Sequence, residues 1–161
     1  HDQFVFLKKF VGATSSGDFI NMNDWVTQAG LNPEADLLLQ MDIEGYEYET
    51  LLATPDALLR RFRIMVIEFH RLHQLWSAPY FRLASAVFSK LLETHSCVHI
   101  HPNNARTSVT IKGIEIPRLM EFTFLRKDRF QAQGPARLFP HPLDCDNTSK
   151  PGIKLPACWQ G

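Results

Sequence analysis

The chain has 161 residues, enough for one domain with a hydrophobic core and too few for two. Lys and Arg together number 17, as do Asp and Glu, so the net charge is zero and nothing favours a surface for nucleic acid or an anionic membrane. The apolar runs are far shorter than the roughly 20 residues of a membrane helix. We therefore expect neither a nucleic acid nor a membrane as a partner.

The three cysteines, Cys97, Cys145 and Cys158, form no CxxC pair. An odd number of cysteines argues against a disulfide framework and favours reduced thiols in the cytoplasm. The first residues lead directly into the apolar Phe4-Val5-Phe6, without an initial Met or a signal peptide. We expect a cytoplasmic protein of which this chain is one part.

Hydrophobic periodicity predicts strands that alternate with helices. The expected strands cover residues 3–11, 37–42, 62–70, 97–101, 107–112 and 120–126. The expected helices cover residues 21–30, 46–52, 57–59 and 79–94. This alternation favours right-handed β-α-β crossovers and a mainly parallel sheet. Half of the ten prolines lie in residues 130–161, which we expect to form an irregular C-terminal wrap.

Capping patterns and one apolar stripe support the helices. Asn21 and Asp24 have the spacing of an N-cap and its reciprocal acid. Thr54 before Pro55 is typical of an N-cap followed by proline at the first helical position. The clearest amphipathic helix, 79–94, has an apolar stripe made of Phe81, Ala84, Phe88, Leu91 and Leu92. Two histidines, His73 and His95, are expected at the surface or at a helix end.

Polar side chains follow three of the apolar strands, at the point where each strand ends. They are Asp42 and Glu44, then Glu68 and His70, then His99, His101, Asn103 and Asn104. In an open α/β sheet, ligands bind outside the carboxyl ends of the strands. If the three strands are parallel neighbours, these groups meet at one edge and form a site.

Each of these groups also has a purely structural interpretation. Asp42 and Glu44 suit the cap of the next helix, where acids are stabilised by roughly 0.3–1 kcal/mol. Glu68 and His70 point to the same face and suit a structural pair. The two histidines of the third strand also share a face, where they suit a zinc site or a wet pocket, but no clear third ligand supports a metal. The Asn103-Asn104 pair after proline suits ordinary turn chemistry.

Four blocks of the sequence, in order, resemble the FkbM-type methyltransferases. DLLLQMDIEGYEYETLL is similar to the family signature, an apolar strand followed by Asp-(Ile/Val)-Glu-Gly-x-Glu and a helix. IMVIEFH resembles the next strand, and VHIHPNN and IEIPRLMEFTFLRKD resemble the late and final strands. KKFVG and INMNDWV fit the lead-in, so that the resemblance covers residues 8–128.

The resemblance implies an α/β fold, part of a class I methyltransferase (Rossmann-like) sheet that is mostly parallel with an antiparallel last strand. It implies an S-adenosylmethionine-dependent O-methyltransferase that acts on a hydroxyl of a sugar or secondary metabolite. Asp42 would stand beside the methyl donor and the acceptor, where it can orient the hydroxyl or take its proton. His70 and His101 are competing bases, because an imidazole titrates near neutral pH. We therefore expect catalytic residues Asp42, Glu44, His70 and His101, and substrate-binding residues Glu68, His99, Asn103 and Asn104.

The sequence departs from the family at the cofactor loop. Members begin with a strand and a Gly-rich turn, where glycine lets the backbone approach the cofactor, and this chain has no GxG element. We expect residues 1–129 to be the C-terminal part of a methyltransferase domain whose main cofactor loop is absent. Taken alone, this part should be inactive, and its bare sheet edge should favour self-association.

Two other classes of function stay open. A metal-dependent hydrolase could use the same acids and histidines, although no HExxH or similar spacing supports it, and we assign no metal ligand. A non-catalytic binding module is the third alternative, because the cofactor loop is absent.

Overall fold

A computed structural model of the chain describes residues 4–131, 134 and 140–159. Four strands form its central sheet: β3 (Leu37–Met41), β4 (Phe62–Phe69), β5 (His95–Pro102) and β8 (Met120–Arg126). Two small two-stranded sheets flank it, one of β1 (Phe10–Val11) and β2 (Phe19–Ile20), the other of β6 (Val109–Ile111) and β7 (Ile114–Ile116). The helices are α1 (Met22–Gln28), α2 (Glu47–Ala53), α3 (Asp56–Leu59) and α4 (Ala78–Thr94), with short 3-10 turns η1 (Leu72–Trp76), η2 (Lys127–Arg129) and η3 (Ala157–Trp159). The α/β class expected from the sequence is confirmed, but the central sheet is mixed and not mostly parallel, because β8 pairs antiparallel with two strands and only β3 and β4 pair in parallel.

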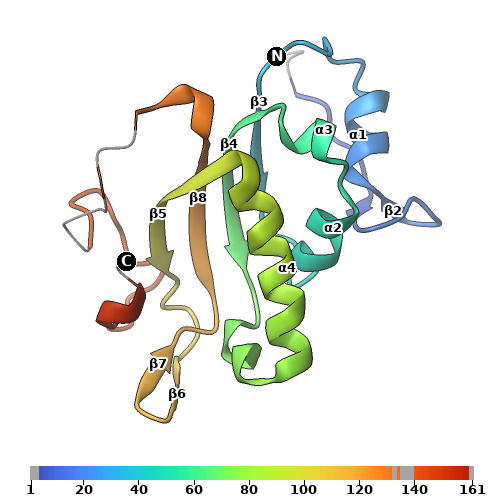
Figure 1. Ribbon diagram of the computed structural model, residues 1–161. Coiled ribbons are helices and arrows are strands. Elements are labelled where there is room, and N and C mark those ends of the chain that lie inside the picture. The colour runs from blue at the N-terminus through green and yellow to red at the C-terminus, as the bar shows by residue number, and fades with distance from the viewer. Residues whose placement is uncertain (1–3, 132–133, 135–139, 160–161) are drawn as a thin grey trace.

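The central sheet has the strand order β3-β4-β8-β5. β3 and β4 are parallel, and β8 is antiparallel to both of its neighbours, so β3, β4 and β5 all run in the same direction. Their carboxyl ends lie at one end of the sheet, where the β6–β7 hairpin also lies (Figure 1). The predicted arrangement, with an antiparallel strand 120–126 between two of three co-directional strands, is confirmed.

Helix α4 supplies much of the core on one face of the sheet. Its buried residues are Ala84, Val87 and Leu91, and the Phe88 ring packs 4.8 Å from the ring centre of Phe69 on β4. The predicted stripe is wrong at both ends, because Phe81 is 55% exposed and Leu92 is 42% exposed. The inward face begins instead at Tyr80, one residue earlier, which packs against the core. An α-helix has 3.6 residues per turn, so only a narrow stripe of its surface can face the sheet.

The capping predictions have mixed outcomes. Asn21 caps α1, since its side chain accepts the Asp24 N–H at 2.8 Å, and the Asp24 carboxylate accepts from the Asn21 amide at 2.9 Å. Thr54 does not cap α3; its hydroxyl donates to the Thr50 carbonyl at 2.7 Å and closes α2. The strand expected over 3–11 is reduced to Phe10–Val11 within the described residues, and β2 and β7 were not predicted.

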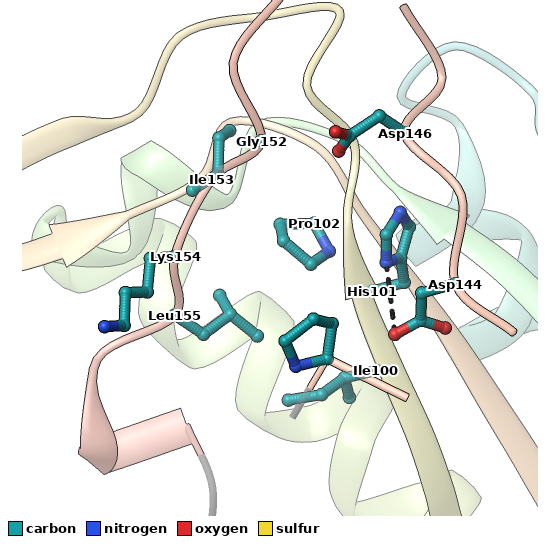
Figure 2. Close-up of a pocket in the computed structure, with 10 residues that line it drawn as sticks. Ile100, His101, Pro102, Asp144, Asp146, Gly152, Ile153, Lys154 and Leu155 are labelled. Atoms are coloured by element: carbon teal, nitrogen blue, oxygen red, sulfur yellow. Dashed lines mark ion pairs between the residues drawn. The ribbon is translucent and has the colours of Figure 1, made fainter. Parts of the chain in front are cut away.

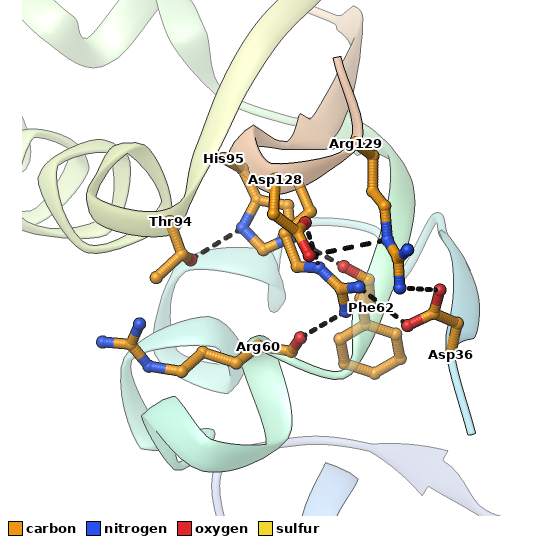
Figure 3. Close-up of polar contacts among 8 residues, drawn as sticks. Asp36, Arg60, Phe62, Thr94, His95, Asp128 and Arg129 are labelled. Atoms are coloured by element: carbon orange, nitrogen blue, oxygen red, sulfur yellow. Dashed lines mark hydrogen bonds and ion pairs between the residues drawn. The ribbon is translucent and has the colours of Figure 1, made fainter. Parts of the chain in front are cut away.

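The end of the sheet opposite the carboxyl ends is held by polar contacts among residues that include Asp36, His95 and Asp128 (Figure 3). The Arg126 guanidinium donates to the Asp36 and Asp128 carboxylates and to the Arg60 carbonyl, at 2.7–2.8 Å. His95 contacts the Phe62 carbonyl at 2.8 Å; it caps the end of α4, as one of its two expected positions required, but it is fully buried and not at the surface. These residues join the amino-terminal ends of β3 and β4 to the last residue of β8. The polar contacts at this end of the sheet therefore have a structural role. The polar residues predicted to form a site lie at the opposite end.

The three cysteines are unpaired and exposed. Among the described residues, no helix combines the length and the apolar character that crossing a membrane requires.

Candidate functional site

The site is built around His70, which follows the last residue of β4. Its Nε2 lies 3.4 Å from Oε2 of Glu44 and 3.9 Å from Oδ1 of Asp42, in the loop after β3. The ring is held on its other side by Glu47, whose Oε1 lies 3.0 Å from Nδ1. The hydroxyls of Tyr48 and Tyr80 donate to the His70 carbonyl, at 3.0 and 2.8 Å. The sequence-predicted residues Asp42, Glu44 and His70 therefore come together as expected, at the carboxyl edge of two neighbouring strands.

Glu47 is the fixed point of this cluster. It is fully buried at the start of α2, and its Oε1 accepts the backbone N–H groups of Ile43 and Gly45 as well as the His70 contact. One carboxylate oxygen thus ties the Asp42–Gly45 loop to the imidazole. Burial has the largest effect on the Glu47 pKa and opposes ionisation, but the hydrogen bonds from His70 and Gly45 prevail and lower the pKa.

The ionised Glu47 fixes the tautomer of His70. A carboxylate can only accept hydrogen bonds, so Nδ1 of His70 carries the proton and Nε2 of the neutral ring is the acceptor. The Glu47 hydrogen bond is the largest influence on His70 and, against the effect of burial, raises its pKa above the ordinary value. Nε2 is thus a proton acceptor directed at the two acids, Asp42 and Glu44.

Glu68, two residues before His70, adds a third acid to this edge. Its Oε1 accepts the side-chain N–H of Asn103 at 3.0 Å, across β8. Burial, followed by the negative charge of Asp42, raises the pKa of Glu68. Asn103 is itself buried and also accepts the Ala105 N–H at 2.8 Å, which is the turn chemistry considered above. Asn103 therefore anchors Glu68 and its own turn at the same time.

The third polar group does not join this cluster in full. His101 pairs in the sheet with Glu121 of β8, which in turn pairs with Glu68, so β8 separates His101 from Glu68 by two strand spacings, about 10 Å. His99 and His101 instead contact the Asp144 carboxylate, at 2.8 and 3.6 Å. Among the described residues, no hydrogen bond or ion pair joins His101 to Asp42, Glu44 or His70. The expectation that all three groups would meet is corrected here, because the antiparallel strand stands between them.

Asp144 belongs to the C-terminal segment, which packs against the end of β5. With His101 it borders a cavity of about 310 Å³, and Figure 2 shows Asp146 and residues 152–155 of the same segment around it. Asn104 is 3% exposed, and its amide bonds the backbone of Thr148 and Lys150 at 2.7–3.1 Å. Asn104 therefore holds this segment in place, and its side chain is occupied by these contacts and not open to a substrate.

Backbone conformation singles out the same edge. Of the described non-glycine residues, three have positive φ: Lys112 in the β6–β7 turn, and Glu44 and Arg71 beside His70, at 57° and 62°. Left-handed backbone costs about 1–3 kcal/mol for a residue with a side chain and is concentrated at functional sites. Glu44, which belongs to the cluster, and Arg71, which follows His70, are thus held in unfavourable conformations by the surrounding structure.

Three of the donors could hold a metal ion. Asp42, Glu47 and His70 each offer one ligand atom, and these three atoms lie within 4.8 Å of one another. However, Glu47 is buried, and one of its oxygens is already shared by three N–H donors. The second oxygen of Glu47 has no hydrogen-bond partner among the described residues, so the three residues equal the ligand number of a catalytic zinc site, but His70 and Glu47 are buried and only Asp42 is exposed.

Residues 23–100 match the family model of the methyltransferase FkbM domain. This segment is therefore similar to the FkbM methyltransferase domain. The match confirms the resemblance inferred from the sequence, and the FkbM segment contains Asp42, Glu44, Glu47, Glu68 and His70. It ends before His101 and the asparagines that follow it. Neither the curated proteins nor the solved structures gave a match.

Sequence reasoning missed Glu47 and Asp144. Glu47 is the last residue of the DIEGYE motif, so the sequence contained a signal for it. Asp144 lies 43 residues beyond His101 in a segment without regular structure, and nothing in the local pattern indicates the contact.

Proposed function

We propose that this chain carries the acceptor side of an S-adenosylmethionine-dependent O-methyltransferase with a class I (Rossmann-like) sheet. The observation that supports it most is the Asp42–His70 cluster, in which acids from the loop after β3 face Nε2 of a histidine after β4, within the FkbM segment. The acceptor is a hydroxyl of a sugar or of another small metabolite. The three cysteines without partners support a cytoplasmic location.

The residues present suit one part of the cofactor. Bound S-adenosylmethionine supplies an electrophilic methyl group on a positively charged sulfur. The exposed carboxyl groups of Asp42 and Glu44 lie at the carboxyl edge, and negative charge there suits a sulfonium. We assign Asp42 a contact with the donor in addition to its role toward the acceptor; the Gly-rich turn has no counterpart in the chain.

The chain's own residues move one proton. The acceptor oxygen forms the new bond to the methyl carbon, and its hydroxyl proton leaves to a base. Asp42 is the base we propose first, because its carboxylate is 54% exposed at the mouth of β3 and can meet a substrate directly. His70 Nε2 is the second candidate; it lies 3.9 Å from Oδ1 of Asp42, beyond hydrogen-bond distance, so the two groups are separate candidates for the base. Glu47 does not meet the substrate; it positions the His70 ring and the Asp42 loop.

Methyl transfer is tested directly. A catalytically competent protein, which contains these residues together with a cofactor-binding turn, is incubated with S-adenosylmethionine and a panel of sugars and hydroxylated metabolites, and mass spectrometry follows S-adenosylhomocysteine and the methylated product. Asp18→Asn is the matched control for Asp42→Asn, because Asp18 is an exposed aspartate whose side chain makes no hydrogen bond with the described residues. Methylation that depends on Asp42 and not on Asp18 supports the proposal. Product formation that survives both substitutions contradicts the role given to Asp42.

The donor group of Asp42, Glu47 and His70 supports one alternative, a metal-dependent hydrolase. Stoichiometric Zn²⁺ or Mn²⁺ in the purified protein, lost on His70→Gln, would favour it over methyl transfer. A non-catalytic binding module is the other alternative, and methylated product excludes it.

A further inference from the structure

A hollow of about 400 Å³ opens beside His70 and is lined by three arginines. Arg71 follows β4, Arg106 lies in the loop after β5, and Arg118 lies between β7 and β8. Three segments that are distant in the sequence thus bring their guanidinium groups to one place. We call it the arginine hollow, defined by Arg71, Arg106 and Arg118.

These three guanidinium groups are not used by the fold. Within the part of the chain that the structure describes, none of them makes a hydrogen bond or an ion pair, whereas Arg126 makes both with Asp36 and Asp128. Like charges that share a hollow repel one another, and an anion between them relieves the repulsion. The protein has no net charge, so the cluster is a local feature and not part of a general excess of basic residues.

The backbone makes room for one of the three groups. Gly45 has a φ of 105°, and a Cβ on it would lie 2.8 Å from Nε and 2.9 Å from Nη2 of Arg71. Such distances are shorter than side chains tolerate, so only glycine lets this guanidinium lie against the loop. Arg71 itself is held in the left-handed region. The positive φ of Gly45 and the left-handed backbone of Arg71 therefore together place the Arg71 guanidinium at the rim of the hollow.

We propose that the arginine hollow binds an anionic group, a phosphate, sulfate or carboxylate, carried by the acceptor. This inference rests on the proposed function and narrows its substrate class to hydroxylated molecules that carry a negative charge, such as a sugar phosphate or an acidic sugar. Guanidinium groups bind such oxygens with paired, charge-assisted hydrogen bonds, and the Thr107 hydroxyl is a further donor in the lining. The Glu44 carboxylate also lines the hollow and repels an anion, but three guanidinium groups outweigh it.

The position of the hollow connects it with the chemistry. His70 belongs both to its lining and to the cluster with Asp42. An anionic group held by the arginines would leave a neighbouring hydroxyl of the same molecule close to Asp42 and His70. The hollow would thus orient the acceptor, and orientation of this kind is a large part of what an enzyme contributes to a two-substrate reaction.

The test is a titration with inorganic phosphate and inorganic sulfate at low ionic strength, by calorimetry and by NMR of the arginine side chains. We expect saturable binding with a Kd of the order of 1 mM, as a few charge-assisted hydrogen bonds provide. Arg106→Gln and Arg118→Gln should each weaken binding at least about tenfold. Arg63→Gln is the control, because Arg63 is an exposed arginine on β4 outside the hollow.

Three results would overturn the proposal. They are an absence of saturable binding, an equal loss in the Arg63 control, and full binding in Arg118→Gln. Circular dichroism checks that the variants fold, and the arginine signals of the unmodified protein locate the anion independently of any variant. The donor also carries a carboxylate, so S-adenosylhomocysteine at millimolar concentration is added as a competitor; displacement of phosphate would assign the hollow to the donor and overturn the acceptor role. None of these measurements uses methyl transfer, so their failure leaves the proposed function untouched.

Discussion

Glu47 Oε1 lies 3.0 Å from Nδ1 of His70, although the two residues come from different elements, the start of α2 and the end of β4. The same oxygen accepts the N–H groups of Ile43 and Gly45. Glu47 therefore couples the loop that carries the acids to the ring that faces them. Carboxylates that orient a functional histidine in this way fix its tautomer and raise its basicity.

Glu47→Gln should loosen this coupling. Glutamine has nearly the same volume, and its amide oxygen can still accept the three N–H groups that contact Oε1, but it has no charge to strengthen these hydrogen bonds. We expect the free energy of unfolding to fall by about 1–3 kcal/mol, the usual result of disrupting a buried charged hydrogen bond. The pKa of His70 should fall as well, as followed by NMR of the imidazole. Glu49→Gln on the exposed side of the same helix is the control and should change neither quantity. An unchanged His70 pKa in Glu47→Gln would contradict the assignment.

Stability should depend on pH through His70. Its folded-state pKa is raised by Glu47, so its contribution to stability is complete below the unfolded pKa of about 6.5 and is lost as the pH rises through the folded pKa. The difference in unfolding free energy between the unmodified protein and His70→Gln should therefore be larger at pH 6 than at pH 9. Urea titrations at the two pH values measure it. His73, whose pKa is lowered by burial and by the charge of Arg118, should give the opposite trend.

The strands of the central sheet could be predicted from the sequence because their hydrophobic residues are the ones that are buried. Met120–Arg126 was predicted with its observed bounds, since its alternating side chains are buried on one face. The hairpin β6–β7 was predicted only in its first half. Its turn uses Lys112 at a φ of 51° followed by Gly113, and a lysine gives little signal for a left-handed position.

The residues of the site that follow neighbouring strands were predicted from the sequence. The residues that come from distant segments were missed. Asp42 and His70 meet because parallel strands bring their carboxyl ends to one edge. His101 was expected there too, but an intervening antiparallel strand cannot be placed from the pattern of β5 alone. The arginine hollow was not predicted because its three arginines come from three loops. Loops have no sequence periodicity that would indicate which of their side chains lie together.

Cofactor affinity follows from what the chain contains. No GxG turn is present to let a backbone approach the cofactor closely, so we expect these 161 residues to bind S-adenosylmethionine weakly or not at all. Calorimetric titration measures this, and S-adenosylhomocysteine serves as a second ligand without the positive charge. A low-micromolar dissociation constant for either ligand would show that other residues hold the cofactor.

Self-association should occur along β3. This strand pairs with β4 on one side, and in the described part of the chain no strand pairs with its other side. Its Leu38 side chain is 68% exposed, and an open apolar edge strand tends to pair with another copy. Sedimentation should therefore show a concentration-dependent mass that Leu38→Lys returns to the monomer. Leu92→Lys, an equally drastic change at an exposed position of α4, should leave the association intact.

Asp42→Asn separates the catalytic interpretation of this acid from the structural one. Asparagine has nearly the same size and keeps an oxygen that accepts hydrogen bonds, but it cannot take a proton or carry the charge. If Asp42 is the base, turnover in the catalytically competent protein should fall by about 10²–10⁴-fold, the usual contribution of a general base. If Asp42 only stabilises the start of α2, both turnover and melting temperature should stay the same, because Asn caps a helix about as well as Asp. Turnover equal to that of Asp18→Asn, with an unchanged melting temperature, would move the role of the base to His70.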